Sequence, residues 1–195
     1  ALGGREVHGE ALIEALWPDA SGLSAQKTLQ ITIRRLRELL GSAEALRMHH
    51  GKLTLDAGRC WVDVWALERM LSRAKDALAH GIWDGAGQRA LAEAQLLYQG
   101  PFLAGEPDQP CLVGRRERVR ERLLRVLDSA GQQLERARRF AEAQALYEQA
   151  VDVEPSAEEL YRRLMVCLSA QGHRAEAMEV YRRCRRHLSI VLGIP

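Results

Sequence analysis

The chain has 195 residues, of which 47% are hydrophobic and 28% charged, and its formal net charge is +2. This composition is typical of a globular protein of one or two domains, and the small net charge excludes nucleic-acid binding through bulk charge, so such binding would need a local basic patch. No segment resembles a signal peptide or is apolar over the length needed to cross a bilayer, which favours a cytoplasmic location.

The cysteines predict free thiols rather than a disulfide framework. The four of them lie far apart in the sequence and form no Cys-x-x-Cys pair: Cys60, Cys111, Cys167 and Cys184. Widely spaced cysteines of this kind are usually reduced in proteins of a reducing compartment. The pattern therefore agrees with the cytoplasmic location.

Two helices joined by a turn are predicted first. Residues 7–16 form a short amphipathic pattern whose apolar side consists of Leu12, Ile13 and Leu16. The connection at 17–23 leads to Ser24, which fits the N-cap of a helix over 24–40. Gly41 tolerates the positive φ with which many helices end. Residues 24–40 are thus predicted as the second and longer helix.

The helix predicted over 24–40 has two different faces. Apolar residues recur at the i, i+4, i+7 and i+11 spacing of a core-facing stripe: Leu29, Ile33, Leu36 and Leu40. The opposite arc holds cations, an amide and one aliphatic residue: Lys27, Gln30, Ile31, Arg34, Arg35 and Arg37. In a major groove, Arg and Lys can contact phosphates or guanine, Gln can pair with adenine, and an aliphatic group can touch a thymine methyl. Basic helix faces are also common as plain solvated surface.

A β-hairpin is predicted after this helix. Residues 46–49 and 52–55 form two short alternating segments, and His50-Gly51 lies between them. Helix, long turn, basic helix and hairpin is the order of elements in a winged helix-turn-helix domain. This context favours DNA contact over solvated surface for the basic face of residues 24–40.

The second helix resembles the recognition helix of the OmpR-type winged-helix regulators. The likeness covers Thr28 to Leu40 and is strongest in the run Ile33-Arg34-Arg35-Leu36-Arg37. Leu16-Trp17-Pro18 resembles the end of the helix that precedes it in that family. The resemblance implies that this helix enters the major groove of DNA.

The same resemblance implies individual contacts. Arg35 would contact a base, Arg34 and Arg37 would hold phosphates, and the loop at 17–23 would touch RNA polymerase. The wing departs from the family pattern, since the aromatic residue usual near its tip is absent and other residues stand there: His49, His50 and Lys52. The predicted DNA-binding residues are Lys27, Thr28, Gln30, Ile31, Arg34, Arg35, Arg37, His50 and Lys52.

A winged helix packs three helices, whereas only two are predicted before the hairpin. We therefore expect residues 1–61 to form a winged helix-turn-helix DNA-binding domain without its first helix. The chain is expected to be part of a longer regulator, with an upstream signalling domain on the same polypeptide as one of its partners.

Only helices are predicted beyond residue 61. The motif Ala-Glu-Ala-x-x-x-Tyr occurs at 92–98, 141–147 and 175–181, and its last two copies are offset by 34 residues, which is the tetratricopeptide period. In such repeats, small residues let paired helices approach closely and an aromatic side chain fills the gap to the next hairpin. The signature positions are Gly131, Ala143, Tyr147, Ala150 and Pro155 in the first unit and Ala177, Tyr181 and Cys184 in the second.

The second half of the chain resembles the bacterial transcriptional activator domain, which follows the winged helix in SARP-type regulators. The likeness rests on Leu97 to Leu103, an Arg- and Glu-rich helix, two helical hairpins and the closing Val191 to Pro195. Residues 62–195 are therefore predicted as this tetratricopeptide-like domain, and the fold class as mainly α with a small β-hairpin wing. The resemblance implies that the domain serves dimerisation or carries signals to the winged helix.

Clusters of arginines in the second domain leave two interpretations open. Glutamates alternate with them at helical spacing, which is typical of a solvated surface with weak ion pairs. The alternative is that the segment from Arg115 to Arg125 touches DNA backbone or an acidic partner, with Arg116 and Arg120 as the contacts to test.

Enzymatic interpretations lack the residues they need. The glycines of 81–87 are not followed by Gly-Lys-Ser/Thr, so they do not form a phosphate-binding loop. His49 and His50 have no carboxylate or cysteine at metal-ligand spacing. We therefore expect no enzyme, no catalytic residues, no metal and no cofactor.

The sequence thus predicts a transcription activator that binds double-stranded DNA, with RNA polymerase and a second copy as protein partners and no membrane association. The alternative is a tetratricopeptide-type scaffold that binds a peptide and no DNA. Salt dependence separates the two hypotheses, because contacts with phosphates weaken steeply with ionic strength whereas an apolar groove hardly responds.

Overall fold

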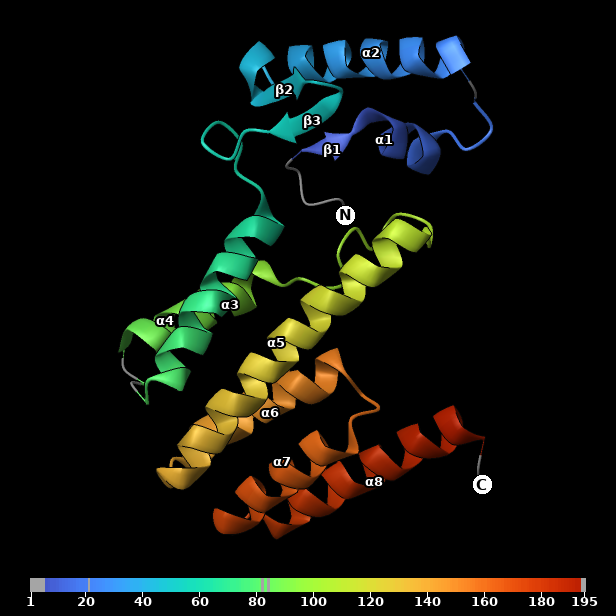
Figure 1. Ribbon diagram of the computed structural model, residues 1–195. Helices are drawn as coiled ribbons and strands as arrows, with labels where there is room; N and C mark the ends of the chain where they lie inside the picture. Colours follow the sequence, from blue (N-terminus) through green and yellow to red (C-terminus); the bar gives the residue numbers. More distant parts are fainter. Residues whose placement is uncertain (1–5, 21, 82, 84, 194–195) are drawn as a thin grey trace. The chain divides into compact units, whose positions relative to one another are not determined.

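The computed structural model describes residues 6–20, 22–81, 83 and 85–193. The chain divides into two compact units, the first comprising residues 1–65 with 105–115 and the second 66–104 with 116–195. The first unit contains a small antiparallel sheet and the second is helical (Figure 1). The predicted fold class is therefore confirmed, while the domain limits 1–61 and 62–195 stay a prediction.

The first unit consists of short elements around one sheet. In chain order they are β1 (Val7–His8), α1 (Gly9–Leu16), α2 (Gly22–Leu39), a 3-10 turn (Ala43–Ala45), β2 (Leu46–His49) and β3 (Lys52–Leu55). The strands lie in the order β1-β3-β2, all neighbours antiparallel. The hairpin β2–β3 is confirmed at its predicted residues, whereas Val7 and His8, predicted as helix, form a third strand opposite Leu53 and Lys52.

The boundaries of α2 differ from the predicted 24–40 by two residues at the start and one at the end. The helix begins at Gly22, so Ser24 lies inside its first turn and is not the N-cap. The carbonyl of Ser24 instead accepts a hydrogen bond from the Thr28 hydroxyl at 3.0 Å. At the other end Gly41 has the predicted positive φ, 66°. Part of the 17–23 loop is thus helical, and Ser21 lies outside the described residues.

The core of the first unit is small. Leu29 and Ile33 of α2 and Leu46 of β2 are buried, and partly buried residues pack against them: Leu12, Ile13, Trp17, Leu53 and Leu55. Two residues of the predicted stripe are wrong as core positions, because Leu36 and Leu40 are 40% and 46% exposed. The apolar side chains of the hairpin pack under the middle of α2 and do not extend to its last turns.

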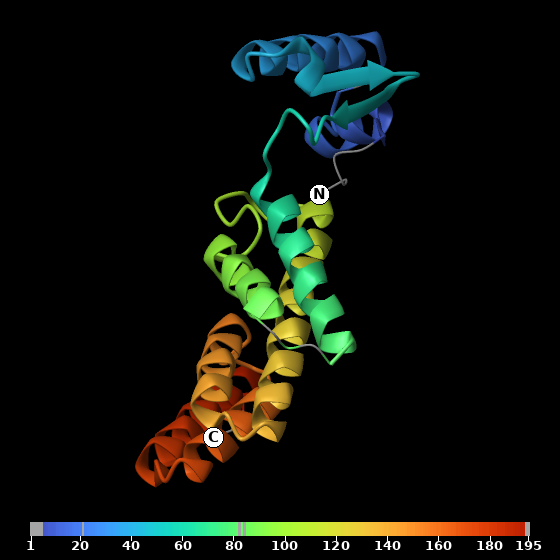
Figure 2. The same cartoon turned by 90° about the vertical axis from the view of Figure 1, so that its left-hand side faces the viewer.

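The second unit is built from helical hairpins. Its helices are α3 (Asp63–Ala79), α4 (Gly85–Leu97), α5 (Pro110–Arg136), α6 (Phe140–Val153), α7 (Glu158–Ala170) and α8 (Arg174–Leu192), of which α3 and α5 begin in residues assigned to the first unit. In both views α6 lies beside the C-terminal half of α5, and α7 and α8 run next to each other (Figures 1 and 2). The helix α3 begins at Asp63, whose carboxylate accepts a hydrogen bond from the Val64 amide at 2.6 Å.

The tetratricopeptide positions of the first repeat pack as predicted. Ala143, Tyr147 and Ala150 are completely buried. A Cβ atom on Gly131 would lie 2.5 Å from Cζ of Tyr147, closer than such atoms approach, so only glycine lets α5 accommodate this ring. The small residue and the aromatic ring therefore occupy the same contact between α5 and α6.

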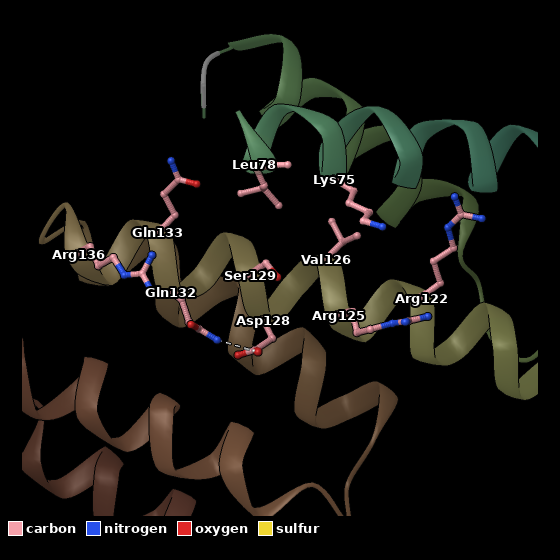
Figure 3. A pocket seen from close by; sticks show the side chains of 11 residues that line it. Lys75, Leu78, Arg122, Arg125, Val126, Asp128, Ser129, Gln132, Gln133 and Arg136 are labelled. Carbon is pink, nitrogen blue, oxygen red and sulfur yellow. Dashed lines mark hydrogen bonds between the residues drawn. The ribbon is translucent and has the colours of Figure 1, made fainter. Parts of the chain in front are cut away.

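A cavity of about 650 Å³ lies between α3 and α5 within the second unit (Figure 3). Arg122 of α5 reaches across to α3, where it donates a hydrogen bond to Oγ of Ser72 at 2.5 Å. Sequence patterns did not predict this cavity, because it depends on how two helices that are separated in the chain by α4 and its flanking loops are placed.

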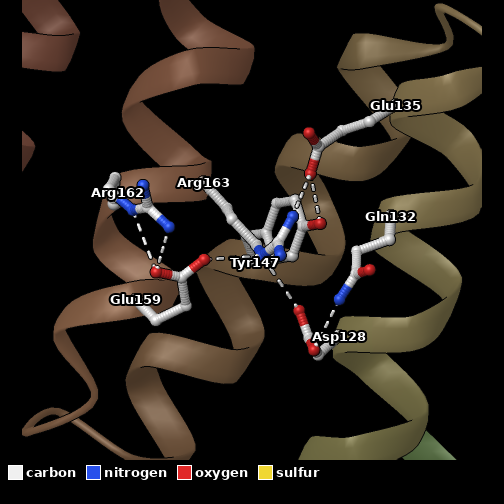
Figure 4. Close-up of polar contacts among 7 residues, drawn as sticks. All are labelled: Asp128, Gln132, Glu135, Tyr147, Glu159, Arg162 and Arg163. Atoms are coloured by element: carbon white, nitrogen blue, oxygen red, sulfur yellow. Dashed lines mark hydrogen bonds and ion pairs between the residues drawn. The ribbon is translucent and has the colours of Figure 1, made fainter.

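A polar network joins α5, α6 and α7 (Figure 4). Arg163 lies 3.2 Å from Asp128 and 3.4 Å from Glu135 of α5, and 3.2 Å from Glu159 of its own helix. The Tyr147 hydroxyl donates a hydrogen bond to Glu135. Burial, and then this hydrogen bond, raise the pKa of Tyr147 well above its usual value. The hydroxyl thus stays protonated and keeps α5 and α6 joined.

Two arginines that could have faced DNA are engaged inside the second unit. Arg116 donates hydrogen bonds to the carbonyls of Phe102 and Leu103, at 2.8 and 2.5 Å. Arg120 pairs with Glu117 at 2.7 Å and also with Glu154. Both side chains thus have partners within the second unit, and the interpretation of Arg116 and Arg120 as DNA contacts stays a prediction.

Candidate nucleic-acid interface

The outer face of α2 is fixed by what packs behind it. Ala25, Leu29 and Ile33 point inward and are at most 7% exposed. On the side of α2 that faces away from this stripe, five side chains are exposed: Lys27, Gln30, Ile31, Arg34 and Arg35. The structure thus places these five predicted residues together on the surface of one helix.

Gly9 is the point at which three elements of the first unit converge. Its amide donates a hydrogen bond to the Gly51 carbonyl at 2.8 Å. A Cβ atom there would lie 3.1 Å from Cδ2 of Leu29 and 3.4 Å from that same carbonyl oxygen. The hairpin turn is therefore held beside the first half of α2. Sequence reasoning missed Gly9, whose only signal is a glycine where a helix former would be expected.

The exposed face of α2 carries three cations and few counter-charges. Arg34 lies 3.7 Å from Glu38 one turn later, and both side chains are strongly exposed. An exposed pair of this kind contributes about 0–1 kcal/mol, so the guanidinium can exchange this carboxylate for another anion. Ile31, 46% exposed, lies among these polar groups without an apolar cover.

Thr28 and Arg37 are held more firmly than the other predicted residues. Both are half-buried. The Thr28 hydroxyl is bonded to Ser24, and Nε of Arg37 donates a hydrogen bond to the Leu46 carbonyl at 2.8 Å. Because a guanidinium has five N–H donors, the far end of Arg37 retains others for a second contact. Arg37 thus connects α2 to the start of the wing.

The tip of the wing carries histidines in place of the aromatic residue that is usual there in OmpR-type regulators. His50 and Gly51 both have positive φ, 47° and 73°, which is the combination that a two-residue hairpin turn of type I′ requires. The rings of His49 and His50 meet edge to face with centroids 4.0 Å apart. Lys52 is half-buried, and its Nζ atom lies 3.5 Å from a carboxylate oxygen of Glu6. The structure therefore exposes His50 and gives Lys52 a partner.

Two ion pairs around the wing were not expected from the sequence. Arg47 of β2 lies 2.7 Å from Asp56, just beyond β3, and Arg59 pairs with Glu44. Asp56 also donates its amide to the Ala45 carbonyl at 2.8 Å. These contacts close the base of the hairpin. A sequence signal for them is weak, because the partners become neighbours only when the strands pair.

Neither a metal site nor a membrane span is found in the described chain. Within residues 6–20, 22–81, 83 and 85–193, no group of three or more His, Cys, Asp or Glu side chains is arranged to hold a metal ion. None of the helices described is long and apolar enough to cross a membrane.

A helix with a basic outer face, backed by a short helix and followed by a β-hairpin, defines a winged-helix protein, here joined to tetratricopeptide-like hairpins. Residues 62–195 match the family model of the Bacterial transcriptional activator domain. The chain belongs to this family, and its combination with the winged helix is that of the SARP-type regulators. A role in transcription regulation follows from this membership.

Its relatives include regulatory proteins of Streptomyces. The chain is 29% identical to Regulatory protein AfsR of Streptomyces griseus over 98% of its own length and 19% of the relative's. It is 27% identical to Regulatory protein DnrI of Streptomyces peucetius over 98% of its length and 74% of the relative's. The chain thus spans about a fifth of the AfsR relative. These relatives are regulators rather than enzymes.

A solved structure supports the fold. The chain has a TM-score of 0.74 with Mycobacterium tuberculosis EmbR, which was solved in complex with a low-affinity phosphopeptide, at 23% sequence identity. The match covers 97% of this chain and 51% of that one. It confirms the arrangement of a wing followed by helical hairpins as a fold.

Proposed function

We propose that this chain is a DNA-binding transcription activator module in which α2 enters the major groove of double-stranded DNA. The observation that carries the proposal is the outer face of α2, where cations, an amide and an uncovered aliphatic side chain lie on one helix with its core side closed. Membership of the Bacterial transcriptional activator domain family supports the same role.

The proposed roles follow from side-chain chemistry and exposure. Arg35, Gln30 and Ile31 are exposed on α2 and are proposed to read bases, through guanine, adenine and a thymine methyl respectively. The residues proposed to contact the phosphates of the DNA backbone are Lys27, Arg34, Arg37, Thr28, His50 and Lys52. Arg37 would contact a phosphate only through its terminal guanidinium nitrogens, because its Nε atom already donates a hydrogen bond to the Leu46 carbonyl.

Fluorescence anisotropy with a labelled pool of random DNA duplexes at two salt concentrations tests this proposal. The natural chain is compared with the double variant Arg34→Ala/Arg35→Ala. We expect binding that weakens steeply with salt, and a loss of about tenfold or more in the variant, because two cations leave the interface.

The double variant Arg185→Ala/Arg186→Ala is the matched control, since it removes two exposed arginines of α8 and causes the same change in net charge. Equal losses in both variants would mean that only net charge matters and would reject α2 as the reading helix. If the natural chain binds no DNA at either salt concentration, the scaffold hypothesis is favoured.

We further propose that the turn after α1 contacts RNA polymerase. Pro18 and Asp19 are exposed there, between α1 and α2. The support is the resemblance to OmpR-type regulators, whose corresponding loop has this role. Reversal of charge by Asp19→Lys should lower activation in a reconstituted transcription assay without changing DNA affinity; an unchanged transcript level would reject this contact.

The helical unit is proposed to serve dimerisation or to relay signals from another domain of the same polypeptide. Tyr181 of α8 is 48% exposed, and it borders a hollow between α7 and α8 that includes Met165 and Leu188. The same surface favours the second candidate function, a peptide-binding scaffold. Sedimentation velocity of the natural chain and of Tyr181→Glu decides between them, since a dimer that this change dissociates supports dimerisation.

A further inference from the structure

The cavity between α3 and α5 has a polar and strongly basic lining. Its volume is about 650 Å³, within the range of about 300–1,000 Å³ that is usual for small-molecule sites. The residues around it lie on one stripe of each helix (Figure 3): Lys75, Leu78, Ala79, Arg122, Arg125, Val126, Asp128, Ser129, Gln132, Gln133 and Arg136.

The charges of this lining are unbalanced. Lys75, Arg122, Arg125 and Arg136 are positive, and Asp128 is the one carboxylate among the lining residues. Asp128 is already engaged, because it lies 3.2 Å from Arg163 and accepts a hydrogen bond from Gln132 at 2.8 Å. A hollow bordered mainly by positive charges concentrates anions.

The four cations have no carboxylate partner among the described residues. Arg122 donates to the Ser72 hydroxyl, and Arg125 donates to the Glu121 carbonyl of its own helix at 3.3 Å. Elsewhere in the second unit, arginines pair with carboxylates, as at Arg120, Arg139, Arg162, Arg163, Arg182 and Arg183. The cations of the cavity thus retain donors that an anionic ligand could use.

The cavity has two ends of different character. Lys75, Arg122 and Arg125 gather at one end, and Gln132, Gln133 and Arg136 at the other (Figure 3). Apolar surface from Leu78 and Val126 lies between them (Figure 3). At 1.5 Å per residue, Arg122 and Arg136 are about 21 Å apart along α5, which is further than one phosphate can bridge.

We propose that this cavity binds a nucleoside di- or triphosphate. Its phosphates would lie among Lys75, Arg122 and Arg125, since guanidinium groups bind phosphate oxygens in pairs of hydrogen bonds. The base would lie against Leu78 and Val126, where the amide of Gln133 can bond its edge. The site is separate from α2 and would let a nucleotide regulate the protein.

Isothermal titration calorimetry at 150 mM salt tests the proposal, with ATP, GTP, AMP and tripolyphosphate as probes. We expect ATP or GTP to bind, and to bind at least about tenfold more tightly than AMP, because each phosphate adds charge-assisted hydrogen bonds. The variant Lys75→Gln/Arg125→Gln should weaken nucleotide binding about tenfold or more. Both residues are exposed and form no ion pair among the described residues, so the fold should persist.

The double variant Arg73→Gln/Arg186→Gln is the matched control, because it removes two exposed cations outside the cavity. Its nucleotide affinity should equal that of the natural chain, and an equal loss in both variants would overturn the proposal as a bulk-charge effect. A natural chain that binds neither ATP nor GTP would overturn it as well.

A DNA arm separates the two sources of phosphate. If the cavity variant loses affinity for duplex DNA while no nucleotide binds, the cations serve the DNA backbone and the nucleotide proposal is wrong. Nucleotide binding that is lost in the cavity variant, with unchanged DNA affinity, supports it. Neither result depends on whether α2 reads the major groove.

Discussion

The two units of this protein use buried residues in opposite ways. In the first unit, Leu29, Ile33 and Leu46 form a small core, and the helix that supplies most of it, α2, also carries the proposed DNA contacts. In the second unit whole aromatic side chains, such as Tyr147 and Tyr161, are almost completely buried between helices. Core residues and proposed contacts thus lie on one helix in the first unit, whereas in the second unit the buried rings lie apart from the surfaces proposed for binding.

The second unit repeats this contrast within itself. Tyr147 and Tyr181 are the same position of the 34-residue motif, yet Tyr147 is completely buried and Tyr181 is 48% exposed. Tyr147 meets Gly131 and Glu135 of α5, whereas Tyr181 borders the open hollow between α7 and α8. The motif therefore specifies the helical hairpin and not the burial of its aromatic residue.

Removal of the buried ring should have the largest effect on stability. Tyr147→Ala is expected to lower the free energy of unfolding by about 3–5 kcal/mol, because it leaves a cavity and removes the partner of Glu135. Tyr181→Ala should cost about 1 kcal/mol or less, as a half-exposed residue does. Urea denaturation followed by circular dichroism measures both, and similar costs for the two would contradict the comparison.

A core change in the first unit should affect stability and DNA binding together. Leu29→Ala is expected to cost about 2–5 kcal/mol and to abolish DNA binding, because α2 loses its support. Hydrogen exchange should then show faster exchange in residues 6–55 and unchanged exchange in α6 to α8. The exposed Leu39, changed to Ala, is the control and should alter neither; slow exchange retained in Leu29→Ala would contradict the prediction.

Adding a methyl group at Gly131 and at Gly9 should lower the stability by different amounts. Gly131→Ala is expected to cost about 1–3 kcal/mol, because its Cβ would lie 2.5 Å from the ring of Tyr147. Gly9→Ala should cost less, since its nearest neighbour is the end of the flexible Leu29 side chain at 3.1 Å. Thermal unfolding measures both, with Gly105→Ala, which meets open space, as the control.

The most local expected effects concern individual DNA contacts. Arg35→Ala should cost about 1–3 kcal/mol at one base pair and relax specificity there. Arg37→Ala should weaken binding to all sequences alike and also lower the melting temperature, because it loses the hydrogen bond to Leu46. Binding to a library of single-base variants measures both, and a uniform loss in Arg35→Ala would contradict its role as a base contact.

The sequence predicts local features well because they depend on neighbours in the chain. The hairpin β2–β3 around His50-Gly51 and the small residues around Tyr147 are confirmed for this reason. Contacts between distant segments were missed, such as the strand formed by Val7 and His8 and the partners of Arg116. The same cause explains Leu36 and Leu40, whose periodicity is that of a core-facing stripe but whose side chains remain 40% and 46% exposed.

The backbone conformation of His50 lowers the stability of the wing. Its φ of 47° lies in the left-handed region, which costs a non-glycine residue about 1–2 kcal/mol relative to ordinary backbone. Glycine there would relieve that strain. A histidine at this position therefore exchanges part of the stability of the hairpin turn for an exposed imidazole at the tip of the wing.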